Sequence, residues 1–173
     1  MAKPKLTDPR IVKKPKQKMA IVETHGDPND VFPQIMPALY GAVYTLKFDL
    51  KKKGKETFKV GALFGCWPDW VGKPKEQWTG YIGLPIPSNT RKLVQKVPDV
   101  EVRVETWEYG PAVAEILHIG PYNAEPPTIQ RLRDFIEASG YEVAGVHEEE
   151  YLTSPKSKVQ KTLIRYPVKK IKG

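Results

Sequence analysis

Three consecutive glutamates stand between a histidine and a tyrosine in the segment HEEEY, residues 147–151. On a β-strand successive side chains point to opposite faces, so His147, Glu149 and Tyr151 share one face and the other two glutamates share the opposite one. A carboxylate held among aromatic rings attracts a cation, or has its pKa raised toward a value that suits general acid–base catalysis. The alternation alone does not decide which face is buried, and three glutamates on a surface strand are usually just solvated.

Aromatic side chains are abundant and could surround such a carboxylate. The chain has four tryptophans, eight tyrosines and five phenylalanines. Trp67, Trp70 and Trp78 lie close together in the sequence, although buried tryptophans belong to the core more often than to a ligand site. Tyr40 and Tyr44 are one helical turn apart, on the flank of an apolar stripe, where they can line a cleft.

The sequence contains none of the strong catalytic motifs. It has no phosphate-binding glycine loop, no nucleophile elbow and no paired metal ligands. The single cysteine, Cys66, and the three histidines, His25, His118 and His147, have no zinc-type spacing. We therefore expect no metal and no cofactor, and a reducing compartment.

The net charge of +8 is concentrated at the two ends of the chain. Residues 1–18 carry a net charge of +6 and residues 156–173 a net charge of +7, which leaves the interior at −5. Nucleic-acid binding is therefore not favoured, except as a minor role of the basic ends. No stretch approaches the roughly 18 apolar residues of a membrane span, and no signal segment opens the chain, so we expect a cytoplasmic protein.

Turn residues divide the chain into short strands and two helices. Residues 1–16 are rich in lysine and proline without periodicity, which indicates a flexible basic arm. Apolar residues recur at helical spacing from Ile35 to Leu50, after turn residues 25–30 that offer an N-cap, and Pro37 either begins the regular part of this helix or kinks it. A second helix is expected from Pro126 to the residue before Gly140. The expected strands are residues 19–22, 57–67, 77–86, 100–106, 112–119, 143–152 and 161–168.

Both halves of the chain have the order strand, glycine turn, helix, two strands. Gly26 and Asn29 in the first half correspond to Gly120 and Asn123 in the second, at one common offset. The repeat predicts an α+β fold of two β-α-β-β modules, with antiparallel sheets, helices on one side and a ligand cleft between the modules. We expect a single domain over residues 17–168, with module one at 17–87, a linker and strand at 88–110 and module two at 111–168, followed by a basic tail at 169–173.

Four segments in the second half resemble the GyrI-like small-molecule-binding family in their order and spacing. They are LHIGPYNAEP (117–126), GYE (140–142), HEEEYLTSP (147–155) and KTLIR (161–165). The resemblance extends from Lys18 to Val168. In the first half, the residues Leu39–Tyr40, Tyr44 and Gly65–Trp67 are similar to the stand-alone branch of the family, in which no DNA-binding helix-turn-helix precedes the domain.

This resemblance implies a pair of β-α-β-β (SHS2) modules around a ligand cleft. Members of this family bind flat, hydrophobic and often cationic xenobiotics, and the stand-alone branch hydrolyses the cyclopropane ring of DNA-alkylating cyclopropanoid compounds inside an aromatic cage. The expected function is therefore the binding of planar hydrophobic or cationic aromatic molecules by a cytosolic protein, with cofactor-independent hydrolysis of cyclopropanoid compounds. The alternative is a non-catalytic module that sequesters xenobiotics, and the sequence leaves the choice open.

The resemblance also implies the site residues. By the spacing to Tyr151–Leu152, the central carboxylate of the family falls on Glu149, as the catalytic residue or as the counter-charge of a cation. Glu150 departs from the family, because an aliphatic residue is expected there, and residues 88–98 are shorter than the corresponding helical region. Five aromatic residues are expected to contact the ligand: Tyr40, Trp67, Trp78, Tyr122 and Tyr151. The oligomeric state does not follow from the sequence.

Overall fold

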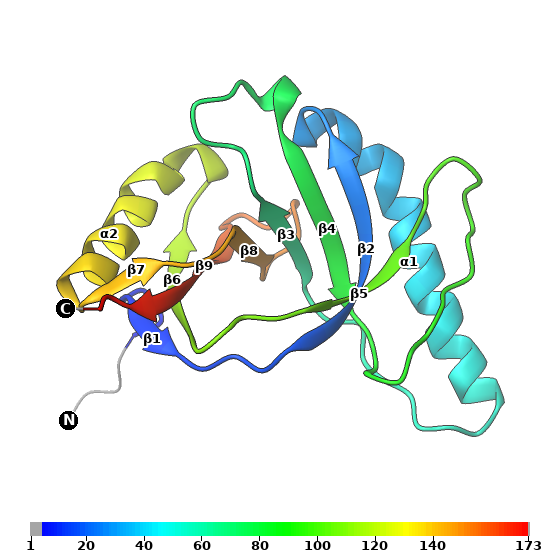
Figure 1. Ribbon diagram of the computed structural model, residues 1–173. Helices are drawn as coiled ribbons and strands as arrows, with labels where there is room; N and C mark the ends of the chain where they lie inside the picture. The colour runs from blue at the N-terminus through cyan, green and yellow to red at the C-terminus, as the bar shows by residue number, and fades with distance from the viewer. Residues whose placement is uncertain (1–4, 173) are drawn as a thin grey trace. The chain divides into compact units, whose positions relative to one another are not determined.

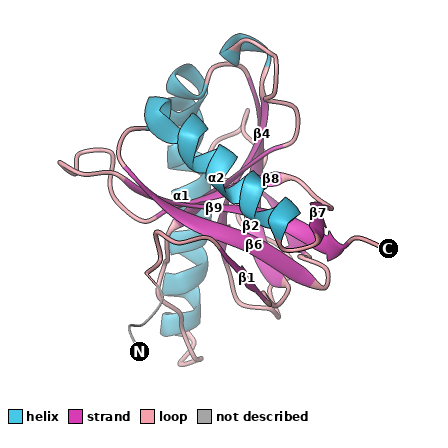
Figure 2. Ribbon diagram, turned by 90° about the vertical axis from the view of Figure 1, so that its left-hand side faces the viewer, coloured by secondary structure: helices cyan, strands magenta, loops and turns pink. Residues whose placement is uncertain are grey.

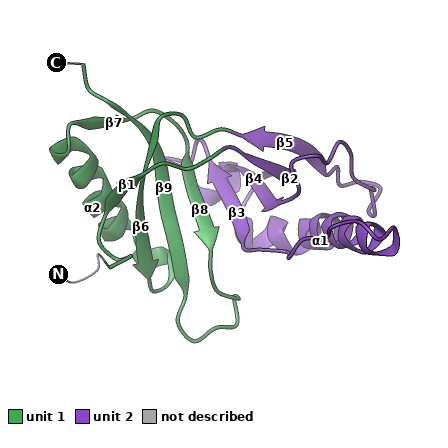
Figure 3. Cartoon of the chain, turned by 90° about the horizontal axis from the view of Figure 1, so that it is seen from below, with its two compact units in different colours: residues 1–15, 108–173 green, residues 16–107 purple. Residues whose placement is uncertain are grey.

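The computed structural model describes residues 5–172 of a mixed α+β chain (Figure 1). The chain divides into two compact units (Figure 3). We call residues 16–107 the N-terminal unit, and residues up to 15 together with those from 108 onward the C-terminal unit. The predicted α+β class is confirmed, because each unit contains the order strand, helix, strands around an antiparallel sheet. No helix within residues 5–172 is long and apolar enough to cross a membrane.

The N-terminal unit has one long helix on a four-stranded sheet. Its strands follow the order β3-β4-β2-β5, and neighbouring strands are antiparallel. The helix packs against β2 and β4. The bounds are β2 (Gln17–His25), α1 (Pro28–Lys52), β3 (Leu63–Trp67), β4 (Thr79–Pro85) and β5 (Arg103–Trp107), with a short 3₁₀ helix, η1 (Lys75–Gln77), before β4.

Helix α1 begins at Pro28, within residues 25–30 that are expected to offer its N-cap, so Pro37 does not mark its start. The carboxylate of Asp27 accepts a hydrogen bond from the backbone N–H of Asn29 at 2.9 Å and so caps the first turn. Pro28 suits the first helical position, because no intrahelical partner exists there for a backbone N–H. Pro33 and Pro37 lie inside the helix, and each removes one backbone hydrogen bond.

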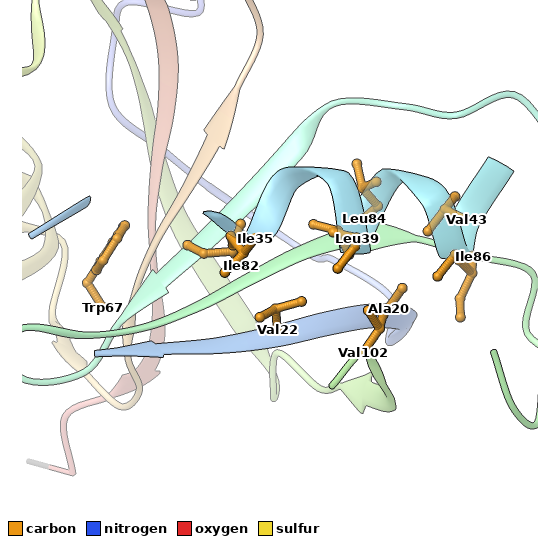
Figure 4. Packing of buried hydrophobic residues seen from close by; sticks show 12 residues of the cluster. Ala20, Val22, Ile35, Leu39, Val43, Trp67, Ile82, Leu84, Ile86 and Val102 are labelled. Atoms are coloured by element: carbon orange, nitrogen blue, oxygen red, sulfur yellow. The ribbon is translucent and has the colours of Figure 1, made fainter. Parts of the chain in front are cut away.

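The core of the N-terminal unit lies between α1 and the sheet (Figure 4). Ile35, Leu39 and Val43 of α1 recur at helical spacing and pack on apolar residues of β2 and β4. Trp67 lies at one end of this cluster and is 4% exposed. A Cβ added to Gly80 would come within 2.6 Å of the Trp67 ring, so the close packing of this indole requires a glycine on β4.

The C-terminal unit carries α2 on a sheet of strand order β1-β6-β9-β8, in which β7 also pairs with β9. Helix α2 contacts β6 and β7 and lies across one face of this sheet (Figure 2). The bounds are β1 (Arg10–Val12), β6 (Ala112–Ile119), η2 (Tyr122–Ala124), α2 (Glu125–Ala138), β7 (Tyr141–Val143), β8 (His147–Tyr151) and β9 (Lys161–Lys170). Gly120, which precedes η2, has φ of +134° and corresponds to Gly26 before α1, with φ of +124°.

The single strand expected over residues 143–152 is interrupted between β7 and β8. Val143 pairs with Val168 and Glu148 with Arg165, so five steps along this segment correspond to three along β9. The two extra residues form a bulge around Gly145, where an added Cβ would meet the ring of Pro167 at 2.6 Å. Because the shift is an even number of residues, the alternation of side chains between the two faces is preserved.

The N-terminal segment differs from the flexible arm expected over residues 1–16, of which residues 1–4 lie outside the described part. Arg10–Val12 forms β1 and pairs with β6, and Leu117 donates a backbone hydrogen bond to the carbonyl of Leu6 at 2.8 Å. Pairing with an exposed strand edge, which periodicity does not reveal, orders this segment. At the other end of the chain, β9 extends to Lys170 and so includes the first two residues of the basic tail expected at 169–173. Gly173 lies outside the described residues.

Candidate functional site

The carboxylate of Glu149 is buried in the C-terminal unit, on the face of β8 that α2 covers. The Nε2 atom of His147 lies 3.2 Å from Oε2 of Glu149, and its Nδ1 atom lies 2.6 Å from the Tyr166 hydroxyl oxygen. Glu149 is only 7% exposed and Tyr166 1%. The predicted alternation along 147–151 is therefore observed at its first two positions, His147 and Glu149, which share one face.

His147 is neutral at neutral pH. Burial, together with the positive charge of Arg133, lowers its pKa to about 4, and the carboxyl groups of Glu125 and Glu148 only partly oppose the shift. Its contact with Glu149 is therefore a hydrogen bond of a neutral imidazole and not an ion pair. Since a carboxylate can only accept, we assign the ring hydrogen to Nε2, which leaves Nδ1 to accept from the Tyr166 hydroxyl.

Glu125, the first residue of α2, adds a second buried carboxyl group to the site. It is 6% exposed and hydrogen-bonded to the carboxyl group of Glu149. Burial, then the proximity of Glu149, raise the pKa of Glu125 to about 9. Burial also raises the pKa of Glu149, and the hydrogen bond from Glu125 partly opposes that rise. Two carboxyl groups in such contact hold one proton between them at neutral pH.

A second buried histidine holds the start of α2 in place. The Nδ1 atom of His118, on β6, lies 2.7 Å from the Thr128 hydroxyl, and its Nε2 atom lies 3.0 Å from the carbonyl oxygen of Pro121. These contacts connect β6 to the turn and to the first turn of the helix. They fix the segment that carries Tyr122 and Glu125.

Two tyrosines of the expected site, Tyr122 and Tyr151, meet at the exposed side of this unit. Their ring centroids are 5.9 Å apart and the rings are nearly perpendicular, at 86°. Tyr122 is 47% exposed, and the pKa of its hydroxyl is raised by burial and then by the charges of Glu149 and Glu125. Tyr122 is thus partly exposed and within electrostatic range of both carboxyl groups.

The site also has a spacing that would suit a cation. Glu125, His147 and Glu149 each offer one ligand atom within 4.8 Å of the other two. When no cation is bound, the two carboxyl groups are close enough to share a proton. The same three side chains can therefore hold either a cation or a shared proton.

Glu148 and Glu150, the other two glutamates of β8, form ion pairs with Arg165. The alternative that the three glutamates are simply solvated on a surface strand is therefore wrong. Arg165, on β9, donates from Nη1 to Glu148 at 3.3 Å and lies 2.7 Å from Glu150 through Nη2. Its Nε atom donates to Glu115 at 3.0 Å, and the Tyr109 hydroxyl donates to Glu148 at 2.6 Å. Glu150, the departure from the family pattern, thus serves as a partner of Arg165 on the face opposite Glu149.

The remaining three expected ligand residues belong to the N-terminal unit. Trp67 is part of its hydrophobic core, and its ring lies 5.8 Å from that of Trp78. The indole N–H of Trp78 donates to the carbonyl oxygen of Lys73 at 2.9 Å. Tyr40 is half-buried and stacks on Tyr44 at 6.4 Å. Tyr122 and Tyr151 thus belong to the C-terminal unit and the other three aromatic residues to the N-terminal unit, and their contact with a ligand remains a prediction.

Sequence reasoning missed Glu125 and Tyr166 and gave His147 no role. Glu125 lies inside the segment LHIGPYNAEP that carries the resemblance, directly before Pro126, and is the first residue of α2. An acidic side chain at the start of a helix is normally stabilised by the positive end of the helix dipole, so the presence of Glu125 there can be explained without a functional role. Only its contact with β8 identifies it as part of the site.

Comparison with known proteins agrees with this architecture. The profile of the GyrI-like small molecule binding domain matches residues 7–169. A comparison with curated protein sequences finds no match.

Several solved structures share the fold over nearly the whole chain. An uncharacterized conserved protein from Listeria innocua is 24% identical with a TM-score of 0.81, and the match covers 94% of this chain and 93% of that one. A hydrolase from Listeria innocua is 23% identical with a TM-score of 0.79, covering 94% and 92%. The C-terminal domain of EcmrR is 14% identical with a TM-score of 0.64, covering 95% and 98%.

Proposed function

The chain belongs to the GyrI-like small-molecule-binding family, and from this premise we propose that it binds planar hydrophobic or cationic aromatic molecules beside Glu149 and hydrolyses cyclopropanoid ones. The observation that carries the proposal is the buried Glu149–Glu125 pair next to the half-exposed ring of Tyr122. Such a site offers a stacking surface and an acidic group at the same place.

Hydrolysis is the finer part of the proposal, and it rests on the chemistry of the site. A cyclopropane conjugated to a carbonyl group opens when the carbonyl oxygen is protonated or hydrogen-bonded and water attacks a ring carbon. Glu149 is suited to orient that water and to accept its proton, because the neutral His147 donates to one carboxylate oxygen and fixes its position. The presence of a hydrolase from Listeria innocua among proteins of the same fold is in keeping with this reaction class.

The aromatic residues would hold the planar substrate. Tyr122 and Tyr151 present rings at right angles, so one ring can stack on a flat ligand while the other meets its edge. Tyr40 and Trp78 remain proposed ligand contacts of the N-terminal unit. Trp67, which is buried, would act by supporting Trp78.

The second candidate function is sequestration of lipophilic cations without chemistry. A buried carboxyl pair that holds one proton can release it when a cation binds, and two buried negative charges then face the ligand. Under this function the ligand leaves unchanged.

Product mass distinguishes the two functions. The protein is incubated with a neutral cyclopropanoid compound and, separately, with a planar aromatic cation, and each mixture is analysed by mass spectrometry. Hydrolysis adds one water to the cyclopropanoid compound, whereas sequestration returns both compounds unchanged and shows only as binding. Glu142→Gln, a change of an exposed glutamate on β7 that contacts Lys169, is the matched control for removal of a negative charge. Recovery of both compounds unchanged, without binding, would contradict both functions.

A further inference from the structure

Glu125 and Glu149 form a pair of buried carboxyl groups without a basic partner. Glu125 is 6% exposed and Glu149 7%. Within the described part of the chain, neither carboxyl group forms an ion pair with a lysine or an arginine. On the opposite face of β8, by contrast, Glu148 and Glu150 are both paired with Arg165. A shared proton removes only one of the two buried charges, so the pair favours a positively charged ligand.

A buried oxygen of Glu125 also lacks a partner. Its Oε1 atom has no hydrogen-bond partner among the described residues. Buried polar atoms are nearly always paired, and a bound ion or water molecule is one of the few explanations for an unpaired one. The carboxyl group that carries this oxygen belongs to a convergent set, because Glu125, His147 and Glu149 each offer a ligand atom within 4.8 Å of the other two. The unpaired oxygen therefore points to a ligand at the place to which the charges also point.

The spacing of these three side chains suits a small metal ion. Zn²⁺ binds histidine nitrogen and carboxylate oxygen at about 2.0–2.2 Å, so that two ligands of a tetrahedral ion are roughly 3.3 Å apart. Nε2 of His147 and Oε2 of Glu149 are already 3.2 Å apart. The carboxyl group of Glu125 completes a set of one nitrogen and two oxygens. With three protein ligands, the fourth position of such an ion stays open to water.

Tyr166 holds the imidazole of His147 in the orientation that a metal ligand needs. The Tyr166 hydroxyl oxygen lies 2.6 Å from Nδ1, so Nε2 is the ring nitrogen that faces Glu149. Histidines that bind metal ions almost always have such a partner on their second ring nitrogen. On binding, the ring hydrogen moves from Nε2 to Nδ1, which then donates to the Tyr166 hydroxyl oxygen, and the proton shared by the carboxyl groups is released to solvent.

Two positive groups near the site oppose a cation, but they are weaker than the two carboxylates. Glu125 is the first residue of α2, and the N-terminus of a helix carries about half a positive charge. The guanidinium carbon of Arg133 lies 5.2 Å from the centroid of the Tyr166 ring, beyond the imidazole. The carboxylates place two full negative charges in direct contact with the ion, so a dication leaves the ligand set neutral.

The donor atoms determine the kind of ion. Mg²⁺ and Ca²⁺ are bound mainly by oxygen ligands, whereas an imidazole favours zinc and other first-row transition metals. We propose that Glu125, His147 and Glu149 bind one divalent transition-metal ion of the zinc type, with water in the open position.

This inference goes beyond the proposed function, because it concerns the ion alone and holds whether or not an aromatic compound is bound or hydrolysed. It also departs from the expectation of no metal. That expectation was based on cysteine and histidine spacing, whereas two of these three ligands are carboxylates and one of them lies on a different element.

The test measures zinc binding to the untagged full chain after a chelator has removed bound metals. Isothermal titration calorimetry with ZnCl₂ should show one ion per wild-type chain. Glu125→Gln and His147→Gln each remove one ligand and should weaken binding by more than about 100-fold, since loss of a residue that merely supports a ligand costs about 10–100-fold. Tyr166→Phe, which removes such a support, should fall within that smaller range.

His25→Gln is the matched control. Nε2 of His25 also lies 2.9 Å from a glutamate, Glu23, but this pair is on the surface of the N-terminal unit. The variant should bind zinc with the stoichiometry and affinity of the wild type.

A second measurement needs no variant and covers the case in which Glu125→Gln or His147→Gln does not fold. The melting temperature of the metal-free wild type should rise with ZnCl₂ and return to its starting value with excess chelator, because an ion that binds the folded state stabilises it. MgCl₂ and CaCl₂ at the same concentration should leave the melting temperature unchanged. Co²⁺ in place of zinc should give the strong visible absorption of a four-coordinate site.

Three results would overturn the proposal. The first is a wild type that binds no zinc at micromolar concentrations. The second is binding that Glu125→Gln and His147→Gln retain, or that His25→Gln alone loses, which would place the ion on the surface. The third is stabilisation by MgCl₂ equal to that by ZnCl₂, which would exclude the imidazole as a ligand. No aromatic compound enters these measurements, so each result leaves the proposed function to its own test.

Discussion

Nε2 of His147 lies 3.2 Å from Oε2 of Glu149, two residues further along the same strand and on the same face of the sheet. Because the imidazole is neutral, it orients the carboxylate without cancelling its charge. The Tyr166 hydroxyl, 2.6 Å from Nδ1, in turn fixes the ring. This chain of two hydrogen bonds is the physical reason why Glu149 is held in one position.

Removing the Tyr166 hydroxyl should loosen that position. In Tyr166→Phe, Nδ1 of His147 loses its partner in a buried place, which should lower the free energy of unfolding by about 1–3 kcal/mol. Urea unfolding followed by circular dichroism measures the change. Tyr141→Phe, on β7, is the matched control and should change the stability by less than about 0.5 kcal/mol. Equal stabilities of Tyr166→Phe and the wild type would mean that this hydrogen bond contributes nothing.

The pKa of Glu125 gives stability a defined pH dependence. Folding raises this pKa from its ordinary value of 4.5 to about 9, so the folded protein binds the proton more tightly than the unfolded chain. The stabilisation is complete below pH 4.5 and is lost as the pH rises toward 9. Folding lowers the pKa of His147 from 6.5 to about 4, so this residue affects stability only below about pH 6.5. There the unfolded chain binds the proton more tightly, and the free energy of unfolding decreases as the pH falls from 6.5 toward 4.

Between pH 6.5 and 9 we therefore expect the melting temperature of the wild type to fall with rising pH, and to fall less in Glu125→Gln. Differential scanning calorimetry in buffers of equal ionic strength measures both proteins. Parallel curves for the two would show that Glu125 does not hold a proton over this range.

The N-terminal segment should contribute to stability, contrary to the flexible arm that its composition suggests. Arg10 donates from Nη2 and Nε to Oε1 of Glu115 at 2.8 and 3.1 Å, while Arg165 occupies the other carboxylate oxygen. Arg10→Ala should lower the free energy of unfolding by about 1 kcal/mol, since the pair is only partly buried. Lys13→Ala, an exposed neighbour, is the control, and identical denaturation curves for both variants would contradict the role of β1.

Alanine substitutions should separate the aromatic residues that support the fold from those that bind ligand. Trp67→Ala removes a core side chain and should cost about 3–5 kcal/mol of stability, so it is unsuited to test binding. Tyr122→Ala, at an exposed ring, should leave the melting temperature nearly unchanged and weaken binding of a planar aromatic compound. Thermal unfolding and fluorescence titration measure the two effects. A stable Trp67→Ala protein, or unaltered binding by Tyr122→Ala, would contradict this division.

How far the sequence predicts the site can be seen at residues 147–151. The alternation predicts that His147 and Glu149 share a face, because side-chain direction depends only on the strand. It does not predict which face is covered, since that depends on α2 and on the bulge at Gly145, where Pro167 of the partner strand packs. The burial of Glu148 depends likewise on Arg165, which lies on a different strand.

The contact between Glu125 and Glu149 is the part that the sequence could not supply. Glu125 is explained locally by the helix that it begins, and nothing near it in the sequence indicates a second carboxyl group. The same holds for β1, whose pairing with β6 is a long-range contact without a periodic signal. By contrast, the β-α-β-β repeat was predictable, because strand alternation, glycine turns and helical spacing are all local patterns.

The central claim is that Glu149 carries the function of the site, and one measurement tests it most directly. Wild type and Glu149→Gln are incubated with a neutral planar cyclopropanoid compound, and the product is quantified by mass spectrometry while binding is followed by fluorescence. Glutamine keeps the shape of the side chain but cannot accept a proton from water. The account predicts that the wild type adds one water to the compound and that Glu149→Gln loses turnover by at least about 10²-fold while it still binds the compound. Equal turnover of the two proteins would contradict it.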